Sequence, residues 1–214
     1  MGKKKEERKP GVRGVRFAQD RSRETLRRIL EAAEQLFAEK GYDKTTIADI
    51  ISRAGIGHGT FWLYFHNKED LLQFMVRDMI KELEAFGWYA EDNLEDFPVR
   101  TMQQVEEIIR GVMDVFARYS TIHPPTMQAS MQSEDFRAAL EELNRPFVRI
   151  LEMKLREHLE KGLCRGLDPE VTAYIIVDML EYINVQWANN SLPADRDALI
   201  HNLSSVIYHT LNHT

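Results

Sequence analysis

The 214-residue sequence contains a single cysteine, Cys164, and no apolar run of the roughly 20 residues that a membrane-spanning helix needs. One cysteine excludes a disulfide framework and fits a reducing compartment. The opening MGKKKEERKPG is charged, and no apolar segment follows it, so it does not have the pattern of a secretory signal peptide. These absences lead us to expect a cytoplasmic protein with no membrane partner.

The patterns that mark common enzyme and cofactor sites are also missing. No Gly-x-Ser-x-Gly, His-Glu-x-x-His or glycine-rich nucleotide loop occurs. His209 and His213 lie four residues apart, as metal ligands on a helix can, but near a chain end a frayed surface pair explains them better. We therefore expect no enzyme activity, no cofactor and no metal site.

The charge is distributed unevenly along the chain. The net charge is −6, which taken alone argues against a nucleic-acid partner. Residues 1–70, however, carry 15 Lys and Arg against 11 Asp and Glu, whereas the remainder carries 13 against 23. This asymmetry indicates a basic module joined to an acidic body. Residues 1–20 lack periodicity and are interpreted as a basic flexible arm, in which Arg13 and Arg16 either reach a DNA minor groove or are simply solvated.

Two helices are predicted between Ser22 and Gly55. The first carries one apolar stripe at helical spacing and ends at Gly41, a typical C-cap residue; its stripe is Leu26, Ile29, Leu30, Ala33 and Phe37. The second follows Thr46, which with Asp49 three residues later resembles a capping box. It is only two to three turns long, so it depends on its neighbours for stability.

The stretch AGIGHGTFWLYFHNKEDLL predicts a turn and another short helix. Residues 55–57 form the turn, and residues 58–65 form the helix, with Phe61 and Phe65 facing inward. Asn67 then caps a further helix. Two short helices joined by a glycine turn are the helix-turn-helix plan, and the absence of side chains at Gly57 and Gly59 allows close approach to DNA phosphates.

The run RRILEAAEQLFAEKGYDKTTIADIISRAGIGHGTFWLYFHNKEDLL closely resembles the N-terminal domain of TetR-family transcription regulators. The resemblance spans about residues 23–72. Two positions depart from the family pattern, because Gly57 stands where Ser is usual and Trp62 where Tyr is usual. Each loses a hydroxyl that contacts phosphate or base elsewhere in the family.

The resemblance implies a set of DNA-contacting residues. His58 matches a position that often reads or approaches bases, and the others match positions that contact phosphates or lie along the groove. The full expected set is Thr45, Thr46, Gly57, His58, Gly59, Thr60, Trp62, Tyr64 and Lys68. Three of these residues could instead have a role that does not involve DNA. Thr46 could be only an N-cap, Tyr64 could belong to the core, and Lys68 could be a solvated surface charge.

The larger half of the chain is predicted to be helical throughout. The expected helices cover about 70–90, 98–120, 124–131, 134–161 with a break at Pro146, 168–188 and 195–212. Soft and aromatic side chains recur on these helices, which suits an adaptable apolar pocket, although most of them could simply be core. This half also resembles, more weakly, the branch of the ethionamide-resistance regulator, which binds long lipophilic ligands.

From this resemblance and the residue types we expect a set of ligand-binding residues, namely Ile108, Val115, Tyr119, Met127, Met131, Phe147, Met179 and Tyr182. Gln128, Glu181 and Asn184 are candidate polar partners for a ligand head group. The helix over 168–188 is apolar nearly all round, so it is expected to be buried against both the core and a second copy in a C2 dimer.

Together these features predict an all-α protein with a basic arm (1–20), a three-helix helix-turn-helix domain (21–69) and a ligand-binding and dimerisation domain (70–214). The expected function is a homodimeric repressor, released from a pseudo-palindromic double-stranded DNA operator by a small apolar effector. The alternative is a helical carrier of a lipophilic molecule that does not act through DNA.

Overall fold

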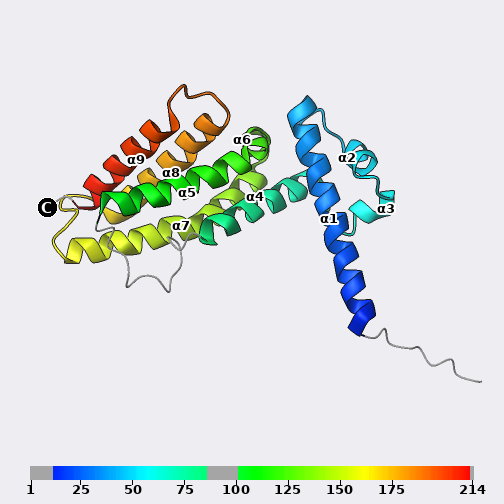
Figure 1. Ribbon diagram of the computed structural model, residues 1–214, viewed down its shortest axis with the longest axis horizontal. Helices are drawn as coiled ribbons and strands as arrows, with labels where there is room; N and C mark the ends of the chain where they lie inside the picture. Colours follow the sequence, from blue (N-terminus) through cyan, green and yellow to red (C-terminus); the bar gives the residue numbers. More distant parts are fainter. Residues whose placement is uncertain (1–11, 86–100, 213–214) are drawn as a thin grey trace, which may run out of the picture. The chain divides into compact units, whose positions relative to one another are not determined.

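The computed structural model describes residues 12–85 and 101–212, and the side chains of 21–84 and 101–212 (Figure 1). Within these ranges every regular element is a helix, which confirms the predicted all-α class. None of the described helices is long and apolar enough to cross a membrane. The chain divides into two compact units between Leu71 and Leu72.

The first unit contains α1 (Val12–Lys40), α2 (Ile47–Ala54) and α3 (His58–Phe61), with α2 in contact with both of the others. The predicted apolar stripe of α1 lies inward, since Ile29 and Ala33 are fully buried and Phe37 is 4% exposed. Gly41 follows with a φ of +82°, the left-handed conformation that ends a helix.

Helix α1 begins at Val12, about ten residues before the expected start at Ser22. Residues 12–20 are therefore helix rather than the expected arm. Residues 1–11, and the side chains of Arg13 and Arg16, lie outside the part of the chain that the structure describes.

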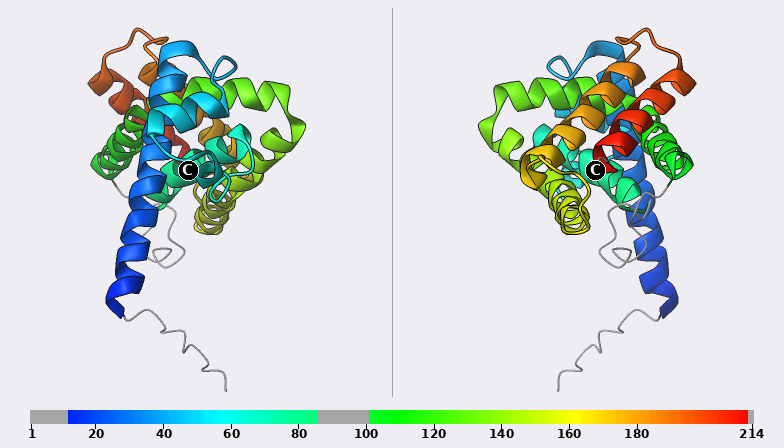
Figure 2. Two further views of the ribbon diagram at one scale, coloured as in Figure 1. Left: turned by 90° about the vertical axis from the view of Figure 1, so that its right-hand side faces the viewer. Right: turned by 90° about the vertical axis from the view of Figure 1, so that its left-hand side faces the viewer.

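The second unit contains most of α4 (Lys68–Ala85), then α5 (Met102–Arg118), η2 (Ser120–Ile122), α6 (His123–Gln132), α7 (Glu134–Glu160), α8 (Pro169–Ala188) and α9 (Arg196–Leu211). Helix α8 packs against α5 and α7, and α9 packs against α5 (Figures 1 and 2). Their facing sides form one hydrophobic cluster that includes Ile109, Met113, Leu155, Ile176 and Ile207. Most of this unit's stability comes from that burial.

Helix α7 is continuous, so the expected break at Pro146 is wrong. Proline has no N–H, and the carbonyl of Glu142 therefore loses its helical donor. Both residues are exposed, so water can satisfy that carbonyl. The next two residues, Phe147 and Val148, are buried and hold the helix in line.

Replacing Leu155 by Ala should lower the free energy of unfolding by about 2–5 kcal/mol, because the side chain is 1% exposed and its loss leaves a cavity. Leu159→Ala is the matched control one turn further along α7, where the side chain is 40% exposed, and should cost less than about 1 kcal/mol. Urea unfolding at fixed protein concentration measures both. Equal losses would contradict this account of the core.

Candidate nucleic-acid interface and cavity

The segment that follows the glycine turn has one inward and one outward face. Phe61 is fully buried and Phe65 is 3% exposed, with ring centroids 5.7 Å apart, as the sequence predicts. The outward residues are exposed: His58, Gly59, Trp62 and Leu63. A row of exposed apolar and polar groups is thus held by two aromatic anchors.

Helix α3 ends at Phe61, so the prediction of a helix to Phe65 is wrong in its length. Leu63 and Tyr64 donate to carbonyls three residues back, and the chain continues as tight turns. The Tyr64 hydroxyl donates to the Ser22 carbonyl on α1 at 3.1 Å, and its oxygen lies 3.0 Å from the Ser22 Oγ. These bonds and the burial of Phe65 direct the chain back to α1.

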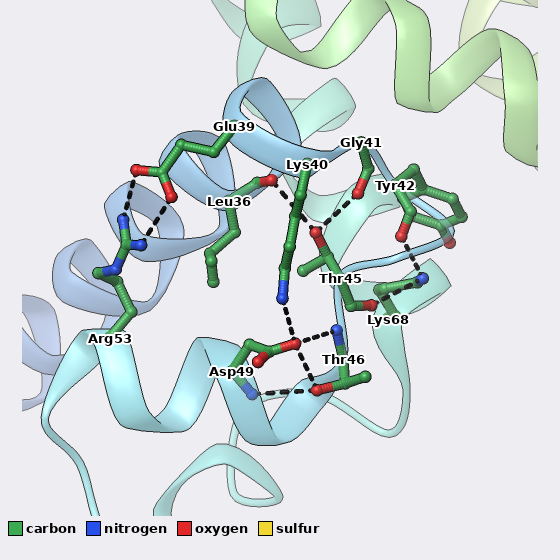
Figure 3. A network of polar contacts seen from close by, with 10 residues as sticks. All are labelled: Leu36, Glu39, Lys40, Gly41, Tyr42, Thr45, Thr46, Asp49, Arg53 and Lys68. Carbon is green, nitrogen blue, oxygen red and sulfur yellow. Dashed lines mark hydrogen bonds and ion pairs between the residues drawn. The ribbon is translucent and has the colours of Figure 1, made fainter.

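A capping network holds the start of α2 (Figure 3). The Asp49 Oδ2 atom accepts from the Thr46 N–H at 2.8 Å and from its hydroxyl at 2.6 Å, and the Asp49 N–H donates to the Thr46 Oγ1 at 3.2 Å. The Lys40 Nζ atom lies 2.6 Å from the same carboxylate. The interaction with the Lys40 ammonium, and to a smaller extent the hydrogen bonds from Thr46, hold the pKa of Asp49 well below its usual range. The predicted capping box is present, and Thr46 remains exposed.

Thr45 is buried, contrary to its expected place at a DNA contact. It is 1% exposed, and its hydroxyl donates to the Gly41 carbonyl at 2.7 Å and the Leu36 carbonyl at 3.3 Å (Figure 3). A hydroxyl in this place cannot reach a phosphate. It closes the loop between α1 and α2 instead.

Lys68 also acts within the fold. Its ammonium donates to the Tyr42 carbonyl at 2.5 Å and the Thr45 carbonyl at 3.0 Å, and it lies 4.0 Å from the centroid of the Tyr42 ring (Figure 3). Partial burial lowers the pKa of this amine. The first residue of α4 is thereby tied to the loop that positions α2.

Two arginines that the sequence analysis did not single out fix α2 on α1. The Arg53 guanidinium pairs with both oxygens of Glu39, at 2.8 and 2.7 Å (Figure 3). Arg28 donates to the Gly55 carbonyl at 2.8 Å and also to that of Ala54. Their partners lie 14 and 27 residues away, and no local sequence signal could have paired them.

The second unit contains an apolar cavity of about 710 Å³, open solvent at its mouth included. Five elements contribute: α4, α5, the segment from η2 into α6, α7 and α8. The lining residues are Val76, Met79, Ile80, Leu83, Val112, Phe116, Ile122, His123, Thr126, Leu140, Asn144, Phe147, Val177, Leu180 and Glu181. A second, more open hollow shares four of these residues and adds Met127, Ser130, Asp178, Tyr182 and Val185.

Of the eight expected ligand residues, the cavity includes Phe147 alone, and the adjoining hollow includes Met127 and Tyr182. The other five are placed elsewhere. Val115 is fully buried, and Ile108 and Met179 pack against the hydrophobic cluster. Met131 is 83% exposed. The Tyr119 hydroxyl donates to the carboxylates of Asp78 and Glu82. The apolar residues of α4, which the sequence analysis did not propose, line the cavity instead.

The polar candidates also differ. Glu181 lines the cavity, and its Oε2 atom accepts from the Asn144 Nδ2 at 3.0 Å. Asn184 is fully buried in the body of the unit and donates to the Leu180 carbonyl, and Gln128 is not among the lining residues. Within the described residues no group of three His, Cys, Asp or Glu could hold a metal ion, and His213 lies outside them.

The chain was compared with known proteins. The family model described as "Bacterial regulatory proteins, tetR family" matches residues 29–75. The fatty acid metabolism regulator protein of Bacillus subtilis is 26% identical over 80% of this chain and 87% of its own length. The HTH-type transcriptional repressor KstR2 of Rhodococcus jostii is 28% identical over 79% of this chain and 83% of its own. The first is named as a regulator protein and the second as a transcriptional repressor.

A solved structure shares the fold across both units. The transcriptional regulator FadR from Bacillus subtilis, in complex with stearoyl-CoA, superposes with a TM-score of 0.63 at 23% identity, covering 86% of this chain and 97% of that one. The arrangement of helices in each unit is therefore that of a known architecture.

We expect the capping network to make stability depend on pH. The folded-state pKa of Asp49 lies below its unfolded value of about 3.9, so its contribution is present above that pH and is lost as the pH falls. Thermal unfolding of Asp49→Asn should therefore differ from that of the wild type at pH 7, and the difference should shrink progressively as the pH falls below about 4. Lys40→Met should shrink the difference at pH 7. A difference that does not change with pH would contradict this account.

Proposed function

Because the chain belongs to the TetR family of bacterial transcription regulators, we propose that it represses its target genes until a small lipophilic ligand binds in the second unit. The observation that carries the proposal is the exposed row on α3 and the turn after it. Exposed aromatic and polar side chains on a helix-turn-helix are suited to reading DNA.

The DNA contacts that we propose are made by the exposed part of the expected set. His58 and Trp62 are exposed, Thr60 is half-buried, and Gly57 and Gly59 leave the backbone open. Thr46 is exposed at the start of α2. Thr45, Tyr64 and Lys68 instead position the segments on which these residues lie.

The surface of α8 and α9 supports a homodimer. Val171, Tyr174 and Ile175 recur at helical spacing on α8 and are 50–60% exposed, and Val206 on α9 is 54% exposed. Such a face is stable when a second copy covers it. In a C2 dimer the two recognition segments would meet half-sites about 34–36 Å apart on a pseudo-palindromic operator.

The cavity supports regulation by a ligand. Its walls are mostly apolar and carry a few polar groups, as the walls of small-molecule sites usually do. Related proteins are consistent with a lipophilic effector, since one regulates fatty acid metabolism and one was solved with stearoyl-CoA. Release from DNA requires the ligand to bind the DNA-free conformer more tightly than the DNA-bound one.

Gly59→Ala provides a specific test of the recognition surface. A Cβ atom added there has no atom within 4 Å, and Ala favours a helix over Gly, so the variant should fold with unchanged or higher stability. Operator affinity should nevertheless fall by at least about tenfold if the backbone approaches DNA closely. Fluorescence anisotropy with an operator duplex, together with thermal unfolding, measures both effects. Unchanged affinity would place the interface elsewhere.

Trp62→Ala should also weaken operator binding by about tenfold or more. Met131→Ala is its matched control, because it removes another exposed apolar side chain, from the second unit. The operator is found first by sequencing the genomic fragments that the wild-type protein retains. Equal enrichment of the same fragments by the wild type and Trp62→Ala would remove Trp62 from the proposed contacts. If the wild type enriches no fragment above a protein-free control, the repressor proposal fails and the ligand-carrier alternative takes its place.

A further inference from the structure

The charged groups around the cavity all have one sign. The parts of α4 and α5 that line it are apolar, and α7 contributes Leu140, Phe147 and the neutral Asn144. Across both hollows the formally charged lining residues are Glu181 and Asp178, and no lysine or arginine lines either hollow among the described residues. An anionic head group would therefore find no countercharge here.

His123 does not alter this balance. Its Nε2 atom lies 3.0 Å from the Phe116 carbonyl, and because a carbonyl can only accept, Nε2 carries the hydrogen. The ring is 6% exposed and stacks on Phe116, and burial lowers its pKa. His123 is therefore an uncharged part of the cavity wall.

Glu181 is partly satisfied but not neutralised by its neighbours. Asn144 donates to one of its oxygens, whereas a carboxylate offers about four acceptor positions. Surrounding protein raises the pKa of Glu181 by desolvation, and the negative charge of Asp178, three residues earlier on α8, raises it further. The side chain is nonetheless accessible to solvent, because the hollow is open there. A cation bound at this point would relieve both effects.

We propose that the effector is a lipophilic cation, whose apolar part fills the cavity between α4 and α7 while its positive charge lies against Glu181 and, further out, Asp178. This inference rests on the proposed ligand-responsive function and specifies its ligand class. The carboxylates select against acyl anions, and fatty acids and acyl-CoA thioesters are therefore poor ligands for this chain.

Calorimetric titration of the full-length protein without DNA tests the charge preference. The probes are n-decyltrimethylammonium, n-decanoate and 1-decanol, used below micelle-forming concentrations, with tetraphenylphosphonium as a cation of different shape. Both cations should bind at least about tenfold more tightly than decanol, and decanoate should bind most weakly. Decanol isolates the contribution of the apolar walls.

Glu181→Gln should weaken binding of the cations by about tenfold and leave decanol within about twofold, because the amide keeps the shape and removes the charge. Asp178→Asn should produce a smaller loss of the same kind. The matched control is Glu141→Gln, which removes an exposed carboxylate of α7 that does not line the cavity, and it should bind every probe like the wild type.

Four results would overturn the inference: tightest binding of decanoate, equal binding of decanol and the cations, equal losses for all probes in both variants, or no binding of either cation. A separate measurement of operator release distinguishes it from the proposed function. If the cations bind with the expected selectivity but leave the operator complex intact, the inference holds and derepression fails. If decanoate alone releases the operator, derepression holds and the inference fails.

Discussion

The segment over residues 58–65 depends on the burial of two phenyl rings. Helix α3 has only four residues, too few to be stable through its own hydrogen bonds. Phe61 and Phe65 supply the stability that the backbone hydrogen bonds cannot, because both rings are buried in the first unit. His58 is exposed, and Trp62, whose ring lies edge-on to that of Phe61, is 51% exposed. The buried face of this short segment thus fixes its shape, and the opposite face is left exposed.

A second set of contacts fixes the position of the elements that carry that segment. The loop between α1 and α2 is closed by the Thr45 hydroxyl and held by the Lys68 ammonium, while Arg53 and Arg28 hold α2 on α1. Each of these contacts uses a backbone carbonyl or a carboxylate as acceptor. Polar side chains therefore do much of the positioning in the first unit, and the second unit relies on a continuous apolar core.

Sequence patterns predicted those features that are local. The Thr46 cap, the Gly41 helix end and the inward Phe61 and Phe65 follow from spacing within one or two turns, and each is present. The family resemblance was confirmed, since the strongest motifs lie in one continuous run. Thr45 was misplaced because adjacent threonines look equivalent in sequence, although one faces the core and the other faces solvent.

The cavity could not be predicted in the same way. Its walls come from five elements, and whether an apolar side chain faces the cavity or the core depends on how those elements pack. Phe147 and Val115 are both apolar residues at helical spacing, yet one lines the cavity and the other is buried core. The net charge of the cavity wall is also a property of the assembled fold. Asp178 and Glu181 make it negative because no basic residue lies among the described residues that line the two hollows.

The proline in α7 has a consequence for the cavity wall. Leu140, Asn144 and Phe147 line the cavity from the turns on either side of Glu142, whose carbonyl has no helical donor because residue 146 is proline. Bending α7 at this point breaks no backbone hydrogen bond there, so the wall can yield at lower cost than an uninterrupted helix. Under the proposed function, such a wall would accommodate molecules of different girth, and the range of ligands would then be set by a backbone irregularity as much as by side chains.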